Sequence, residues 1–117
     1  MKQVIFLEIT ISIETYDRRQ VVSSLFDREW ANFGDEKRIS DNATIKYKSE
    51  IFRKAEGVPQ EVIIILTLLS EFAVSLAANW LYDKLKGKAT KLEIELTEVE
   101  IDKDEIKRII IEKVKKS

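Results

Sequence analysis

The sequence predicts an α+β domain in which three to four mainly antiparallel strands form a sheet with helices packed on one face. Apolar and polar residues alternate from Ile5 to Ile13, which indicates a strand with one wet face. Two other stretches repeat apolar residues at helical spacing, one over Asp17–Phe33 and one after Asp102. The three glycines and the single proline fall at proposed element boundaries. A length of 117 residues is enough for one domain, 1–117, with its own core.

The first half of the chain is predicted to form a strand, a helix and a hairpin. The helix covers Asp17–Phe33, and Gly34 is the natural residue after its last turn. A second strand is expected over Thr44–Arg53, where apolar and charged residues alternate. Asp41-Asn42 before it tolerate the left-handed conformation of a turn, so Lys37–Ser40 is expected to be a short partner strand.

The segment Val62–Tyr82 has Glu71 as its only charge. We expect one long helix from about Pro59 to Lys86, because a core-facing stripe runs through it at helical spacing. The stripe comprises Val62, Ile65, Leu66, Leu69, Phe72, Ala73, Leu76, Ala77 and Trp80. An alternative is open here: the β-branched run Val62–Leu66 is a buried strand, and the helix starts at Ser70.

The C-terminal part predicts one more strand and one more helix. Leu92–Thr97 alternates apolar and polar residues, and the change of register at Thr97-Glu98 suggests a bulge. Asp102 is expected to cap the last helix, with Glu105 three residues later as in a capping box. The buried stripe of this helix is Ile106, Ile109, Ile110 and Val114. The element order then matches a ferredoxin-like βαββαβ unit with an added C-terminal helix.

Composition excludes several kinds of chemistry. The chain has no cysteine and no histidine, so thiolate sites, zinc sites and histidine-based catalysis are absent. A net charge of −1 gives no overall attraction to a polyanion. The charged fraction of 35% resembles that of proteins from hot environments. The N-terminal stretch reads as a strand and not a signal peptide, so the expected location is the cytoplasm.

Two binding or catalytic interpretations carry less weight than their structural alternatives. Acidic pairs, Asp17 with Asp27 or Asp102 with Asp104 and Glu105, would serve a magnesium site, but capping and solvation explain them more simply. A nucleic acid would need an open sheet face made basic and aromatic by Lys46, Lys48, Arg53, Lys54, Phe6, Tyr47 and Phe52. Glutamates are expected to share that face, which disfavours this reading. No cofactor and no enzyme activity are predicted.

The segment 62–82 is also long enough for a membrane span, at about 31 Å as a helix. Trp80, Tyr82 and the lysines that follow would imitate an interfacial belt. Against this stands the charge of Glu71 near the centre of the segment, together with the polar residues around it. A core helix is therefore preferred, and a membrane-associated protein is kept as the second alternative.

One stretch carries a resemblance. Ala78-Asn-Trp-Leu-Tyr-Asp-Lys-Leu-Lys, followed by a strand and Glu98-Val-Glu-Ile-Asp before a helix, resembles the C-terminal part of small uncharacterised prokaryotic proteins. The resemblance covers about residues 71–115. It implies a packed helix, a strand and a capped helix, and it implies no activity.

The sequence favours a small soluble protein that acts through protein–protein contact or as a homo-oligomer. The reason is surplus apolar surface: Ile63, Ile64 and Leu68 lie off the stripe of the long helix, and Ile111 lies off that of the last helix. Ile63, Ile64 and Leu68 are therefore the candidate interface. A nucleic-acid-binding domain is the first alternative.

Overall fold

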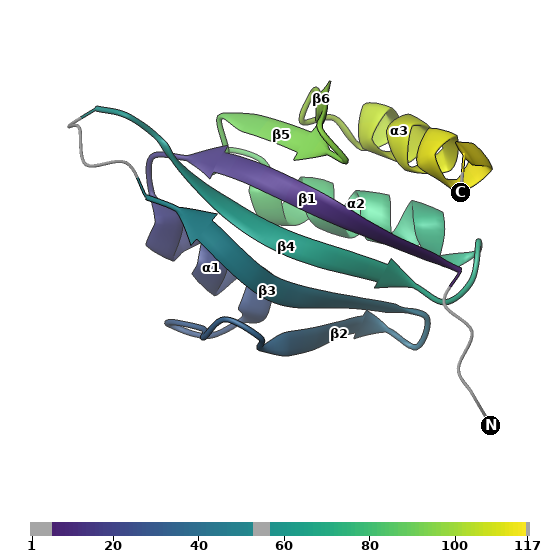
Figure 1. Ribbon diagram of the computed structural model, residues 1–117, viewed down its shortest axis with the longest axis horizontal. Coiled ribbons are helices and arrows are strands. Elements are labelled where there is room, and N and C mark those ends of the chain that lie inside the picture. The colour runs from purple at the N-terminus through teal and green to yellow at the C-terminus, as the bar shows by residue number, and fades with distance from the viewer. Residues whose placement is uncertain (1–5, 53–56, 117) are drawn as a thin grey trace.

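In the computed structural model, which describes residues 6–52 and 57–116, six strands form one antiparallel sheet in the order β2-β3-β4-β1-β5-β6 (Figure 1). The predicted α+β class is confirmed. The sheet has six strands in place of the expected three to four, and the ferredoxin-like order is not confirmed, because β4 and β6 are additional strands. Along the chain the elements are β1 (Leu7–Thr15), α1 (Arg18–Phe26), β2 (Glu36–Ser40), β3 (Ala43–Ile51), β4 (Gln60–Leu68), α2 (Ala73–Leu85), β5 (Lys91–Ile94), β6 (Thr97–Val99) and α3 (Lys103–Lys116).

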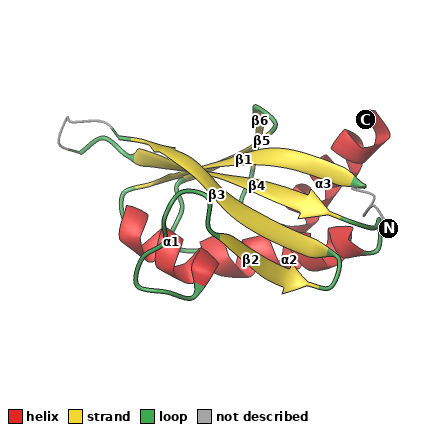
Figure 2. Cartoon of the chain, turned by 60° about the horizontal axis from the view of Figure 1, so that its bottom comes forward, coloured by secondary structure: helices red, strands yellow, loops and turns green. Residues whose placement is uncertain are grey.

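The helices α1 and α2 lie on the same face of the sheet, as both views show (Figures 1 and 2). α1 packs against α2 and β4, whereas α3 lies beside α2 and reaches β6. The core lies between the sheet and these helices. Its strand residues repeat with period two, and those on the two central strands are Leu7, Ile9, Ile11, Ile13, Val62, Ile64, Leu66 and Leu68.

β1 confirms the alternation seen in the sequence, with Leu7, Ile9, Ile11, Ile13 and Thr15 buried. The expected start of this strand, Ile5, lies outside the described residues. β1 occupies the middle of the sheet, paired with β4 on one side and β5 on the other. The first strand of the chain therefore joins the two halves of the sheet, β2-β3-β4 and β5-β6.

The prediction of one helix over Pro59–Lys86 is wrong, and the alternative of a strand followed by a helix describes the chain. β4 pairs along its whole length with β1. Val62 and Ile64 face the helices, and Ile63 and Ile65 lie on the opposite face of the sheet. Because both faces of β4 carry apolar residues, the sequence shows no alternation of apolar and polar residues here. Consecutive β-branched side chains favour such a strand.

α2 begins only after a turn at Ser70–Phe72. The Ser70 hydroxyl accepts a hydrogen bond from the Phe72 amide at 3.0 Å, and the Ser70 carbonyl accepts one from the Ala73 amide at 3.1 Å. This satisfies amides at the helix start that have no intrahelical partner. The alternative interpretation expected the helix to start at Ser70, and α2 starts three residues later, at Ala73.

α1 is shorter than predicted. Asp17 caps its start by accepting from the Gln20 amide, but the helix ends at Phe26 and not at Phe33. Asp27 takes the left-handed conformation with φ of 53°, a position that often closes a helix. The expected end residue, Gly34, instead donates its amide to the Tyr47 carbonyl in the loop beyond.

The hairpins follow the predictions in part. β2 and β3 form the expected antiparallel pair around Asp41-Asn42, although the predicted end of β3 at Arg53 lies outside the described residues. The expected bulge at Thr97-Glu98 is a two-residue turn at Glu95-Leu96, which joins β5 to β6. Both turn residues have positive φ, 48° and 68°, so this turn is formed without glycine.

α3 confirms the predicted capped helix. The Asp102 carboxylate accepts a hydrogen bond from the Glu105 amide at 3.1 Å. Ile106, Ile109 and Ile110 are buried as expected. The second half of a capping box is missing, because the Glu105 side chain binds Arg108 instead of the cap residue.

Candidate functional site

The predicted interface residues are divided between two faces of β4. Ile64 and Leu68 are fully buried against the helices, so they contribute no surface. Ile63 is half-buried on the opposite face of the sheet, next to Ile65 along the strand. The structure therefore does not bring the three residues together, because they belong to a strand and not to a helix.

The face of the sheet opposite α1 and α2 is lined mainly by small polar and acidic residues. β1 places Glu8, Thr10, Ser12 and Glu14 there, and β4 adds Glu61 and Thr67 beside the two isoleucines. Thr10 lies opposite Ile65, and Ser12 lies opposite Ile63. The two isoleucines are thus flanked on the β1 side by a threonine and a serine and do not form a broad apolar patch.

The basic and aromatic set expected for nucleic acid is not assembled on this sheet face. Lys46 lies there, opposite Ile65. Tyr47 is buried on the other side, where its ring stacks on Phe26 at 5.6 Å and meets the edge of Phe33 at 5.0 Å. Arg53 and Lys54 lie outside the described residues. The other two expected aromatic rings, Phe6 and Phe52, are exposed.

A groove between α2 and α3 has a mainly apolar lining. It has a volume of about 520 Å³. The groove residues come from the start of α2 and the second half of α3, and they are Glu71, Phe72, Val74, Ser75, Lys107, Ile111, Val114 and Lys115. We refer to this set as the α2–α3 groove.

Three large apolar side chains are exposed at the α2–α3 groove or beside it. Phe72 is 86% exposed, Leu76 is 44% exposed and Ile111 is 36% exposed. Phe72 and Leu76 are four residues apart, which places them on one face where α2 begins. Several exposed apolar side chains close together are more informative than one alone, because contiguous apolar patches mark candidate interaction surfaces.

The sequence placed Phe72 and Leu76 on the buried stripe, and this assignment is wrong. α2 buries Ala73, Val74, Ala77, Ala78 and Leu81 instead, because the helix starts later than predicted. Ile111, which the sequence set off the stripe of the last helix, is indeed partly exposed. It was the one signal in the sequence that pointed to this surface.

The charges around the α2–α3 groove are arranged asymmetrically. Glu71 lies on the α2 side, and Lys107 and Lys115 lie on the α3 side. Within residues 6–52 and 57–116, none of these three side chains forms an ion pair. They remain available to a partner with complementary charge.

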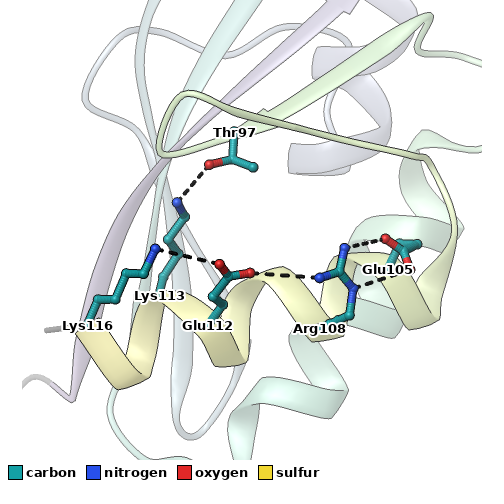
Figure 3. Close-up of polar contacts among 6 residues, drawn as sticks. All are labelled: Thr97, Glu105, Arg108, Glu112, Lys113 and Lys116. Carbon is teal, nitrogen blue, oxygen red and sulfur yellow. Dashed lines mark hydrogen bonds and ion pairs between the residues drawn. The ribbon is translucent and has the colours of Figure 1, made fainter.

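Next to the groove, α3 carries four charged side chains that neutralise one another (Figure 3). Arg108 donates to Glu105 at 2.8 Å and lies 3.8 Å from Glu112, which in turn lies 3.6 Å from Lys116. The hydrogen bond from Arg108 holds the pKa of Glu105 below its usual range. Such pairs three and four residues apart support an exposed helix face.

Near α1, a second polar cluster has a structural role. The Tyr47 hydroxyl donates to Glu50 at 2.6 Å, and Arg18 donates to the same carboxylate oxygen at 3.1 Å. Burial raises the pKa of Tyr47 to about 12, and the bond to Glu50 adds to this effect. Arg18 and the exposed Trp30 line a hollow near α1. The Arg18 guanidinium already forms an ion pair with Glu50.

Asp17, Asp27, Asp102 and Glu105, four of the five acidic residues considered for magnesium, have other partners. Asp17 caps α1 and Asp102 caps α3. Asp27 forms ion pairs with Lys37 and Lys84, which ties the end of α1 to β2 and α2. The described residues contain no group of three acidic side chains able to hold a metal ion.

Comparison with known proteins adds no relative. No family model, no curated protein and no solved structure matches the chain. The resemblance of residues 71–115 to small prokaryotic proteins therefore stays a prediction. Among the helices of residues 6–52 and 57–116, none has the length and apolar character needed to span a bilayer.

Proposed function

We propose that this chain is a non-catalytic protein–protein interaction or oligomerisation module, and that the α2–α3 groove is its binding surface. The observation that carries the proposal is the exposure of Phe72, whose side chain is 86% exposed. This side chain lines a groove together with Val74 and Val114. Aromatic side chains in such positions commonly supply much of the binding free energy of an interface. The surrounding lysines and Glu71 form the polar rim that interfaces have.

The nucleic-acid alternative has less support. Acidic side chains on the open sheet face, among them Glu8, Glu14 and Glu61, would repel phosphates. Of the three aromatic rings expected to stack bases, that of Tyr47 is buried, whereas Phe6 and Phe52 are exposed. The membrane alternative loses its premise, because residues 62–82 form a strand, a turn and part of a helix of 13 residues.

Site-specific photo-cross-linking tests the proposal. A photoreactive amino acid replaces Ser75, which lines the α2–α3 groove, and a matched control replaces Thr10 on the open sheet face. Both proteins are irradiated in extract of the cells that make the chain. We expect a discrete protein adduct from position 75, whether with this chain or another, and none from position 10. Equal adducts from both positions, or none from position 75, would overturn the assignment of the binding surface.

A further inference from the structure

We infer that the occupant of the α2–α3 groove is a second copy of this chain, related to the first by a two-fold axis. This inference rests on the proposed function and names the partner of that surface. A two-fold interface uses the same patch on both copies, so each contact between different residues occurs twice and the patch must complement itself. The α2–α3 groove meets this condition in charge and in shape.

The charge complementarity comes from the division of signs between the two helices. Glu71 belongs to the α2 side, and Lys107 and Lys115 belong to the α3 side. A two-fold axis that passes between the helices brings the α2 of each copy against the α3 of the other. Each Glu71 then faces the partner's lysines, and all three charges gain an opposite charge that they lack within the described chain.

The remaining charges of α3 do not compete for this role. Glu105, Arg108, Glu112 and Lys116 already form a chain of ion pairs along the helix, so they are paired within the chain although Arg108 and Glu112 lie next to Lys115 (Figure 3). Lys113 donates to the Thr97 hydroxyl at 2.8 Å and so is directed toward β6. Lys107 and Lys115 are thus the α3 lysines that line the groove and stay unpaired among the described residues.

The shape of the surface is also self-complementary. Phe72 projects into solvent, whereas the space beside it is a hollow of about 520 Å³ with Val74, Ile111 and Val114 in its lining. The same surface therefore carries a convex apolar group next to a concave apolar space. Two-fold symmetry allows each Phe72 to enter the hollow of the other copy, where the aromatic ring leaves water.

The size of the surface predicts a weak dimer. α2 has 13 residues and α3 has 14, so each helix is about 20 Å long. A face made of two short helices falls at the small end of specific interfaces, and we expect a dissociation constant on the order of 10–100 µM.

Charge-exchange variants of the full chain test the inference by sedimentation equilibrium. E71K gives the groove three lysines, and K107E/K115E gives it three acidic side chains. Because like charges then face each other across the contact, each variant alone should dimerise at least about fivefold more weakly than the native chain. An equimolar mixture should recover a dimer, because the two variants complement each other at both copies of the contact. E8K on the sheet face and K46E/K48E on β3 are the matched controls, and they should dimerise like the native chain.

The outcomes separate this inference from the proposed function. A mixed dimer of the two exchanged variants supports the two-fold arrangement, and F72E should abolish it while keeping a native circular dichroism spectrum. A chain that stays monomeric at about 500 µM would overturn the second copy as occupant, since this exceeds the expected dissociation constant. Cross-linking from position 75 to another protein would then leave the proposed function standing with a different partner. Dimers unaffected by F72E and by both exchanges would overturn the inference and place self-association on another surface.

Discussion

Tyr47 shows how one buried side chain links three parts of the chain. Its ring lies between Phe26 and Phe33, and its hydroxyl donates to Glu50, which also binds Arg18. The loop after α1 is thereby held against β3. Phe33 reaches this cluster from a loop and not from a helix, which explains why its helical spacing in the sequence was misleading.

The raised pKa of Tyr47 makes stability depend on pH in the alkaline range. Its folded pKa of about 12 lies above the usual value near 10, so the contribution is complete below about pH 10 and is lost as the pH rises toward 12. Between about pH 9 and pH 11, the native chain should lose about 1 kcal/mol more unfolding free energy than Y47F. Urea unfolding followed by circular dichroism measures this difference.

The control for this prediction is Y16F, because Tyr16 is exposed at the end of β1. Its stability should follow that of the native chain with pH. A loss of equal size in Y47F and in the native chain would show that the Tyr47 hydroxyl does not titrate in this way.

Leu96 occupies a backbone conformation that leucine rarely adopts. Its φ is 68° and its side chain is 92% exposed, so neither the backbone nor packing favours leucine at this position. The left-handed conformation costs an ordinary residue about 1 kcal/mol, which glycine avoids. L96G should therefore raise the free energy of unfolding by about 1 kcal/mol, as measured by urea titration.

Glu95 provides the comparison for L96G within the same turn. It also has positive φ, at 48°, but its carboxylate accepts a hydrogen bond from the Thr10 amide at 2.8 Å. E95G should gain less than L96G, because it relieves the backbone and loses that bond. If L96G instead lowered stability, the Leu96 side chain would have to contribute contacts in solution.

At the scale of the elements, β4 shows what the sequence could not reveal. β4 carries apolar residues on both faces of the sheet between Val62 and Leu66, so this run lacks the alternation that marked β1. The same run continues at helical spacing into α2, so periodicity alone favoured one helix. The β-branched composition was the better guide.

Other elements were predictable where local chemistry decides them. Asp102 caps α3 and Asp41-Asn42 turns the β2–β3 hairpin, as their side chains suggested. The turn at Glu95-Leu96 was not predictable, because neither residue favours the left-handed conformation. The α2–α3 groove was missed for a related reason. The start of α2 could be placed at Ala73 only once Gln60–Leu68 was known to be a strand.

The two faces of β4 give a direct test of the strand assignment. Ile64 is fully buried and Ile63 is half-buried on the opposite face. I64A should cost about 3–4 kcal/mol of unfolding free energy, and I63A about 1 kcal/mol, because only the first leaves a cavity in the core. Both variants lose the same β propensity, so the comparison isolates burial. Equal losses in chemical denaturation would contradict the alternation.

At the scale of the whole molecule, the sheet edges are poorly suited to pairing with another chain. β2 forms one edge and carries Glu36, Lys37 and Arg38, and β6 at the other edge has only three residues. Charged and short edge strands discourage strand addition. Strand addition at either edge is therefore disfavoured, in keeping with our proposal that self-association uses the helical side.

The two outer faces of the molecule differ in chemistry. The open sheet face carries Ile63 and Ile65 among threonine, serine and glutamate, whereas the helical face carries Phe72, Leu76 and Ile111 around a groove. Our account assigns protein contact to the helical face. An isoleucine lies on each face, so both faces can be observed in one experiment.

The most direct measurement is a methyl NMR titration of the isoleucine-labelled chain from about 20 µM to about 1 mM, a range that spans the expected dissociation constant. We predict that the Ile111 signal shifts with concentration, and that the signals of Ile63 and Ile65 stay in place. F72E should remove the shift of Ile111. Movement of Ile63 and Ile65 without Ile111 would contradict the account, because it would place the contact on the open face of the sheet.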